Sequence, residues 1–299
     1  MVSPTRNSPR PLKGIRIVSL SLNLPGPAAL MRCQQMGASC VKLEPPPAGA
    51  AKGLSGDPMG SYNRAAYETL HKGIRVAVAD LKSDTGQKIL HRELAKADVL
   101  LTSFRPSALK KLGMEWKLLH RLFPMLSQVA IVGAPGKRAE EPGHDLTYLA
   151  ENDLVNALDL PPTLYADMAG SLAASEAVLQ AVLMKGQGKG QLIEVALSQA
   201  AAYLALPRTW GLTQTGAAVG GGHAGYRVYA CKDGRVALAA LEPHFAKAVC
   251  AAAHVKYDNI LTMLAPQTRQ AIAGYLQTMT REALETLARE KDIPLHTLA

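Results

Sequence analysis

The sequence is poor in several features that would point to particular classes of protein. It contains three Phe and two Trp among 299 residues, too few aromatic rings to stack successive bases of a nucleic acid. No apolar run approaches the roughly 20 residues that a membrane-spanning helix requires. The first ten residues lack the apolar stretch of a secretory signal. We therefore expect neither a nucleic-acid partner nor a membrane span.

Cysteine and cofactor motifs are similarly sparse. The four cysteines show neither paired spacing nor a CxxC motif, which is typical of free thiols in a reducing cytosol and favours a cytoplasmic protein. No cluster has metal-ligand spacing, so we predict no metal site. No GxGxxG follows the first predicted strand and no GxxxxGK[ST] occurs, so the usual dinucleotide and P-loop signatures are absent.

What the chain does contain is typical of a folded globular protein with an anionic ligand. Hydrophobic residues make up 48% and charged residues 19%, a balance that excludes a disordered chain. The formal net charge is +9, but the Lys and Arg are scattered along the sequence. Because a few cations are enough for one site, a polyanionic small molecule fits this pattern better than a nucleic acid.

Short β-rich runs alternate with helical patterns over the first two hundred residues. This rhythm predicts an α/β fold: a doubly wound, Rossmann-like parallel sheet in a large domain. The predicted strands cover residues 15–20, 40–43, 75–80, 98–102, 126–132 and 192–196.

The sequence also predicts a division into domains. We expect a flexible tail at 1–10, a large domain at 11–215, a Gly-rich linker at 216–225 and a smaller α+β domain at 226–299. Residues 48–61 are rich in Gly, Ala and Pro and predict a loop. Asp167 is a candidate N-cap for a helix over 168–185, since Asp is favoured there. A further helix is predicted over 198–212.

Three short segments contain residues suited to acid–base chemistry: Pro142-Gly-His-Asp145, Ala166-Asp-Met-Ala-Gly170 and Leu241-Glu-Pro-His-Phe245. Singly, each has an ordinary interpretation: His144 as a loop residue, Asp167 as a helix cap and Glu242 as a surface acid.

Together with four longer stretches, these segments resemble one family in their order. The stretches are PLKGIRIVSLSLNLPGPAALMRCQQMGASCVKLEPP (11–46), HKGIRVAVADLKS (71–83), ADVLLTSFRPSALKKLGM (97–114) and GKGQLIEVALSQA (188–200). The sequence resembles the class III CoA-transferase superfamily, of the formyl-CoA transferase and carnitine CoA-transferase type, over nearly all of its length. It leans toward the α-methylacyl-CoA racemase branch.

The resemblance implies catalytic roles for three residues. Asp167 matches the carboxylate shared by the superfamily. His144 matches the second base of the racemases, and Glu242 matches the acid that orients this His. The implied reaction is epimerisation of the α-carbon of a 2-methylacyl-CoA, which requires a base on one side of the carbon and a protonated group on the other. A helix start at Asp167 would also offer backbone N–H groups to an enolate oxygen.

The resemblance further implies that the substrate is an acyl-CoA thioester, as in fatty acid metabolism. CoA enters as part of the substrate, and no prosthetic group is required. The residues expected to bind its phosphates and adenine, or to line its channel, are Lys42, Lys72, Arg75, Arg105 and Lys111.

Two alternatives stay open at this point. In the transferases the shared Asp attacks the thioester to form an acyl anhydride, so CoA transfer between carboxylic acids is the first alternative. The second is a degenerate member that binds without turnover, since Ser19-Leu-Ser-Leu22 replaces the usual Asp-Leu-Ser-Arg. Relatives form interlocked dimers through a C-terminal return segment that we expect to be missing here. We expect a homodimer and leave interlocking open.

Overall fold

A computed structural model describes residues 9–47 and 56–299, which divide into two compact units. The first unit ends at Ala205 and the second begins at Leu206. This boundary lies before residue 215, where the predicted large domain ended, and the predicted linker at 216–225 belongs to the second unit. Residues 1–8 of the predicted tail lie outside the described residues.

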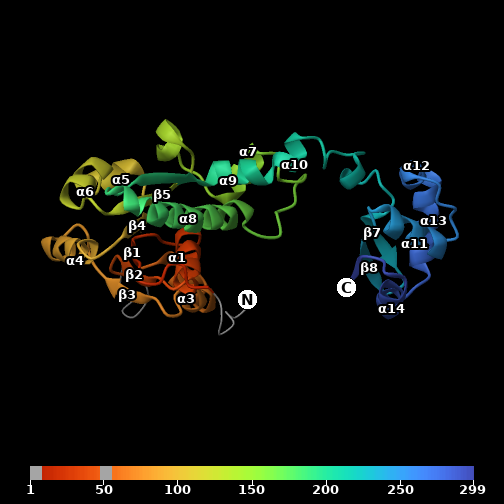
Figure 1. The fold of residues 1–299 in the computed structure, drawn as a ribbon, viewed down its shortest axis with the longest axis horizontal. Helices are drawn as coiled ribbons and strands as arrows, with labels where there is room; N and C mark the ends of the chain where they lie inside the picture. The colour runs from red at the N-terminus through yellow and green to blue at the C-terminus, as the bar shows by residue number, and fades with distance from the viewer. Residues whose placement is uncertain (1–8, 48–55) are drawn as a thin grey trace. The chain divides into compact units, whose positions relative to one another are not determined.

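The first unit contains a parallel sheet that confirms the predicted fold class (Figure 1). In the described part of the chain its strands are β1 (Arg16–Ser19), β2 (Ser39–Glu44), β3 (Arg75–Val78), β4 (Val99–Thr102), β5 (Ser127–Val132) and β6 (Leu192–Ala196). They lie in the order β3-β2-β1-β4-β5-β6, and every pairing is parallel. The strand order reverses between β1 and β4, and open α/β sheets bind ligands beyond the carboxyl ends of their strands at such a point.

Helices cover both faces of this sheet. Over the described residues of the unit they are α1 (Pro25–Gln35), α2 (Pro58–Tyr62), α3 (Arg64–Leu70), α4 (Asp84–Leu94), α5 (Pro106–Lys111), α6 (Trp116–Leu122), η1 (Gly136–Glu140), α7 (Asp145–Glu151), α8 (Tyr165–Met184), η2 (Lys185–Gln187) and α9 (Leu197–Leu204). Neighbouring residues of β1 show the two layers. Ile17 belongs to the core with α1, α7, α8 and α9, whereas Val18 belongs to the core with α4, α5 and α6. Because both faces are covered, β4 and β5 are buried along their whole length.

Several predicted helix boundaries were wrong. Helix α8 begins at Tyr165, so Asp167 lies within its first turn and is not its N-cap. The predicted loop at 48–61 contains α2 from Pro58 onward, while residues 48–55 lie outside the described residues. The predicted helix over 198–212 is divided into α9 and α10 (Leu206–Thr209).

The second unit is an α+β structure, as predicted. Among its described residues, β7 (Tyr226–Cys231), β8 (Gly234–Ala239) and β9 (Leu295–Leu298) form an antiparallel sheet in the order β7-β8-β9. Its remaining helices are η3 (Ala218–Gly220), α11 (Pro243–Ala252), α12 (Ile260–Leu264), α13 (Pro266–Gln277) and α14 (Arg281–Lys291). Across the described residues of both units, no helix is long and apolar enough to cross a membrane.

Candidate active site

His144 and Asp167 lie at the starts of two successive helices that follow β5. His144 is the N-cap of α7, and Asp167 is in the first turn of α8. The backbone N–H of His144 donates to the Thr147 hydroxyl oxygen at 3.0 Å, and this hydroxyl donates to the His144 carbonyl at 2.7 Å. The His144 side chain is exposed, and it forms a capping box with Thr147, whose backbone N–H faces the imidazole. The residue is therefore held at the start of α7 while its ring remains exposed to a ligand.

The carboxyl group of Asp167 has an environment suited to proton transfer near neutral pH. Burial is the largest effect on its pKa, which rises from 3.8 to about 6. The nearby Asp145 carboxylate raises this pKa further, and the electrostatic interaction with His144 lowers it. A carboxyl group with this pKa exchanges protons readily with an imidazole, whose ordinary pKa is about 6.5.

Asp145 contributes to the site, although no role was predicted for it beyond its place in the Gly-His-Asp motif. Its buried carboxylate accepts a hydrogen bond from the backbone N–H of Asp167 at 2.9 Å. This bond replaces the side-chain cap that α8 lacks at Leu164. It also means that the N–H of Asp167 itself is already used, and the prediction that the start of this helix offers N–H groups to an enolate oxygen stays a prediction for the other residues of its first turn.

Tyr148 connects this pair to the carboxyl end of the sheet. Its side chain is buried, and a Cβ atom at Gly133, directly after β5, would lie 2.2 Å from the Tyr148 hydroxyl. Burial raises the pKa of Tyr148 most strongly, the negative charge of Asp167 raises it further, and the positive charge of Arg105 lowers it. The structure thus brings Arg105, one of the predicted CoA-binding residues, into the electrostatic environment of the Asp167 site.

The remaining predicted cations of the first unit are more dispersed. The side chains of Lys72 and Lys111 are exposed, like that of Arg105. Arg75 is the first residue of β3 and forms a salt bridge with Glu93 at 2.8 Å. Arg75 therefore lies at the amino end of its strand, whereas the His144 and Asp167 segments follow the carboxyl end of β5. Because these two ends of a parallel sheet face opposite ways, the structure does not place Arg75 beside Asp167.

Lys42 lies in a buried polar cluster. Its side chain is 0% exposed, and its ammonium group lies 3.0 Å from Glu44 Oε1 and forms a second ion pair with Asp57. It also lies 2.8 Å from His71 Nε2. Burial and the charge of Lys42 both lower the pKa of His71, so its neutral ring can accept from Lys42 through Nε2 and donate to the Tyr67 carbonyl through Nδ1.

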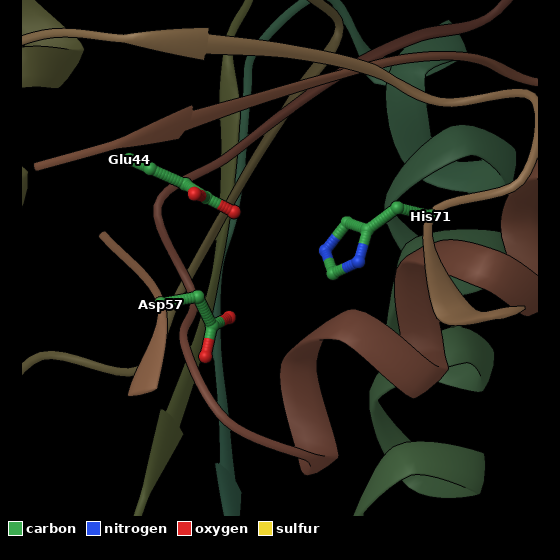
Figure 2. Close-up of side chains that lie close together, drawn as sticks. All are labelled: Glu44, Asp57 and His71. Atoms are coloured by element: carbon green, nitrogen blue, oxygen red, sulfur yellow. The ribbon is translucent and has the colours of Figure 1, made fainter. Parts of the chain in front are cut away.

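Figure 2 shows the side chains of Glu44, Asp57 and His71 pointing toward one another. Their ligand atoms lie within 4.8 Å of each other, a spacing that suits a divalent cation. The ammonium of Lys42 is bound to the same three side chains and supplies the positive charge there. A phosphate would reach Lys42 only if this cluster opened. The prediction that Lys42 contacts CoA stays a prediction, and its surroundings weigh against it.

Glu242 belongs to the second unit, whereas His144 and Asp167 belong to the first. It is the N-cap of α11, with an exposed side chain that makes no capping hydrogen bond. Its role in orienting His144 stays a prediction.

The first unit is thus a doubly wound α/β structure without a glycine-rich dinucleotide motif, in which a carboxyl group of raised pKa and an imidazole follow β5 within electrostatic range of each other. The model of CoA-transferase family III matches residues 12–299, so the chain belongs to that family.

Named relatives include both types of enzyme. Human α-methylacyl-CoA racemase is 29% identical over 293 residues, covering 90% of this chain and 73% of the racemase. The cinnamoyl-CoA:phenyllactate CoA-transferase of Clostridium sporogenes is 28% identical over 211 residues, covering 66% of this chain and 51% of the transferase. This chain therefore spans about half of the transferase's length.

Solved structures agree on the fold. The crystal structure of a hypothetical protein from Mycobacterium tuberculosis has a TM-score of 0.79 at 21% identity, covering 97% of this chain and 84% of that one. The crystal structure of a CAIB/BAIF family protein from Brucella suis has a TM-score of 0.76 at 20% identity, covering 98% of this chain and 85% of that one.

Proposed function

We propose that the chain acts on CoA thioesters and epimerises the α-carbon of a 2-methylacyl-CoA by 1,1-proton transfer. The observation that supports this most directly is that burial raises the pKa of the Asp167 carboxyl to about 6, within electrostatic range of His144. One group removes the α-proton, and the C–H electrons move into the thioester carbonyl to give an enolate. The other group then returns a proton to the α-carbon.

This reaction needs only two groups that exchange protons with the substrate, so we propose no prosthetic group and no metal. CoA enters as part of the thioester. The exposed cations Lys72, Arg105 and Lys111 are the proposed contacts for its negative groups, with Lys42 and Arg75 as the weaker candidates.

CoA transfer between carboxylic acids is the second candidate, and the named transferases among the relatives favour it. Here the Asp167 carboxylate attacks the thioester carbonyl, the C–S bond breaks, and CoA leaves as the thiolate while an acyl–aspartyl anhydride forms. This chemistry uses the ionised form of Asp167, which predominates above its pKa of about 6.

His144 separates the two reactions. If it is the second base, His144→Ala should slow α-proton exchange about a hundredfold to ten-thousandfold, and more for one enantiomer than for the other. His91→Ala is a matched control, because His91 is exposed on α4, whose core lies on the other face of the sheet. The enantiomers of a 2-methylacyl-CoA are assayed separately by mass spectrometry in deuterium oxide.

Hydroxylamine supplies the complementary test. If an acyl–aspartyl anhydride forms, hydroxylamine added with the acyl-CoA should leave a modified Asp167. In that case His144→Ala should have little effect on the rate of CoA transfer. A trapped adduct without any α-proton exchange would replace the racemase assignment with the transferase one.

We also propose a cytoplasmic homodimer. The four cysteines are buried and free, and burial raises the pKa of both Cys33 and Cys40 to about 12, which suits unreactive thiols.

The surface proposed for the dimer lies at the edge of the sheet. The edge strand β6 and helices α8 and α9 border a hollow of about 450 Å³ there. Exposed apolar side chains surround it, including Leu172 at 51% and Tyr203 at 73%. Sedimentation equilibrium measures the dissociation constant of the dimer. We expect Tyr203→Glu to raise that constant, because it would place a charge on the apolar surface that the dimer would bury.

A further inference from the structure

The second unit contains a hollow that no catalytic role accounts for. Its volume is about 480 Å³, within the range of small-molecule sites. It is bordered by the Gly-rich turn at residues 216–222, by Arg227 of β7, by Arg269 of α13 and by Leu264 at the end of α12. All of these residues belong to the same compact unit, so the hollow is a feature of that unit alone.

Two guanidinium groups, those of Arg227 and Arg269, border this hollow. The hydroxyl of Tyr229, which is buried and donates to the Ala224 carbonyl at 2.6 Å, is influenced by both. Burial raises the pKa of this hydroxyl, and the positive charges of Arg227 and Arg269 both lower it. Arg227 precedes Tyr229 by two residues in β7, which places the two side chains on the same face of the strand.

The positive charge of these arginines is not balanced by protein groups. Among the residues bordering the hollow there is no acidic side chain, and across the described residues neither guanidinium forms a salt bridge. Arg227 donates to the Gly221 carbonyl, which is a neutral acceptor. The Nε atom of Arg269 is buried and has no hydrogen-bond partner in the described part of the chain. Neither guanidinium is therefore neutralised by an acidic group of the described residues, and an anion in the hollow would supply the missing negative charge.

The Gly-rich turn provides a close wall without side chains. Gly216 and Gly221 have φ angles of +88° and +96°, which favour glycine. A Cβ at Gly220 would lie 1.8 Å from the Gln214 carbonyl oxygen, and one at Gly222 would lie 2.3 Å from the Gly216 carbonyl oxygen. The backbone is therefore folded tightly on itself beside the arginines, and no side chain from these glycines fills the space.

We propose that this hollow binds an oxyanion, the phosphate or carboxylate group of a small molecule, with Arg269 and Arg227 as its donors. The planar guanidinium matches the paired oxygens of both groups. An oxyanion in the hollow would accept from the guanidinium groups of Arg269 and Arg227 that border it and balance their positive charges. The proposal does not depend on the racemase or transferase assignment.

Calorimetric titration of the full chain with inorganic phosphate, and in parallel with acetate, tests this directly. We expect Arg269→Gln to weaken phosphate binding about tenfold or more, as the loss of a charged hydrogen bond implies. Arg289→Gln removes an equal charge from the exposed surface of α14 and should leave the affinity unchanged. Whichever of the two anions binds more tightly identifies the group that the hollow prefers.

A second pair of variants keeps both arginines. Leu264 borders the hollow and is 41% exposed, so Leu264→Glu would place a carboxylate beside the guanidiniums and should block phosphate, whereas Leu264→Gln should not. Circular dichroism checks that each variant is folded. Equal phosphate affinity in Arg269→Gln and the wild type, or equal losses in Arg269→Gln and Arg289→Gln, would overturn the proposal. So would undiminished binding by folded Leu264→Glu.

Discussion

Replacing Asp167 by Asn should make the protein more stable at neutral pH, although it removes a catalytic group. The carboxyl of Asp167 has a pKa of about 6 in the folded chain, against 3.8 for its ordinary value. Folding therefore favours the protonated form and penalises the ionised one. The amide of Asn has no charge to lose, and the bond from the residue 167 N–H to Asp145 is made by the backbone and survives.

The magnitude and its pH dependence follow from this pKa change. A rise from 3.8 to about 6 corresponds to about 3 kcal/mol between the two protonation states. Because Asp167 is partly exposed, solvent screening reduces this, and we expect Asp167→Asn to gain about 1–2 kcal/mol. Between pH 3.8 and 6 the folded state binds more protons than the unfolded state, so wild-type stability falls as the pH rises. The gain should therefore be absent below pH 3.8, grow through this window and level off above it.

Urea unfolding followed by far-UV circular dichroism at several pH values measures the difference. Asp159→Asn, at an exposed position of the same unit, is the matched control and should show no comparable gain. If Asp167→Asn is no more stable than the wild type at pH 8, or if its advantage is independent of pH, the Asp167 carboxyl is not destabilised by its surroundings. The acid–base argument built on its pKa would then fail.

Two further predictions concern buried polar groups. Asp145→Ala leaves the Asp167 N–H without its acceptor and should cost about 1–3 kcal/mol of unfolding free energy. It also removes a negative neighbour, so the acid limb of the pH–rate profile should move to lower pH. Lys42→Met removes the positive charge that forms ion pairs with two buried carboxylates and should cost about 3–5 kcal/mol in urea unfolding. Arg64→Met breaks an exposed pair and should cost less than about 1 kcal/mol, so equal losses would contradict the buried-cluster interpretation.

The sheet was predictable because its strands carry their own signal. Strands buried on both faces are short apolar runs between turns, and the predicted strands at 98–102 and 126–132 contain β4 and β5, which are buried along their whole length. The start of α8 was not predictable in the same way. Asp is favoured as an N-cap, yet the carboxylate that caps this helix comes from Asp145, 22 residues earlier.

The same limit applies to the buried cluster. Lys42 was predicted to bind CoA because it matches a position where the family carries a cation on the nucleotide. The structure pairs it with Asp57 and His71, which lie 15 and 29 residues along the chain. No local pattern indicates such contacts, whereas His144 and Asp167 could be predicted as site residues because they occur in motifs that resemble those of a known family.

Exchange of the α-proton is the measurement that tests the proposed function most directly. A 2-methylacyl-CoA thioester is incubated with the protein in deuterium oxide, and the mass of the recovered thioester is followed over time. We predict that the wild type incorporates one deuterium at the α-carbon from either enantiomer, and that Asp167→Asn loses this exchange while keeping its fold. No incorporation by the wild type, from any of a panel of 2-methylacyl chains, would contradict the assignment.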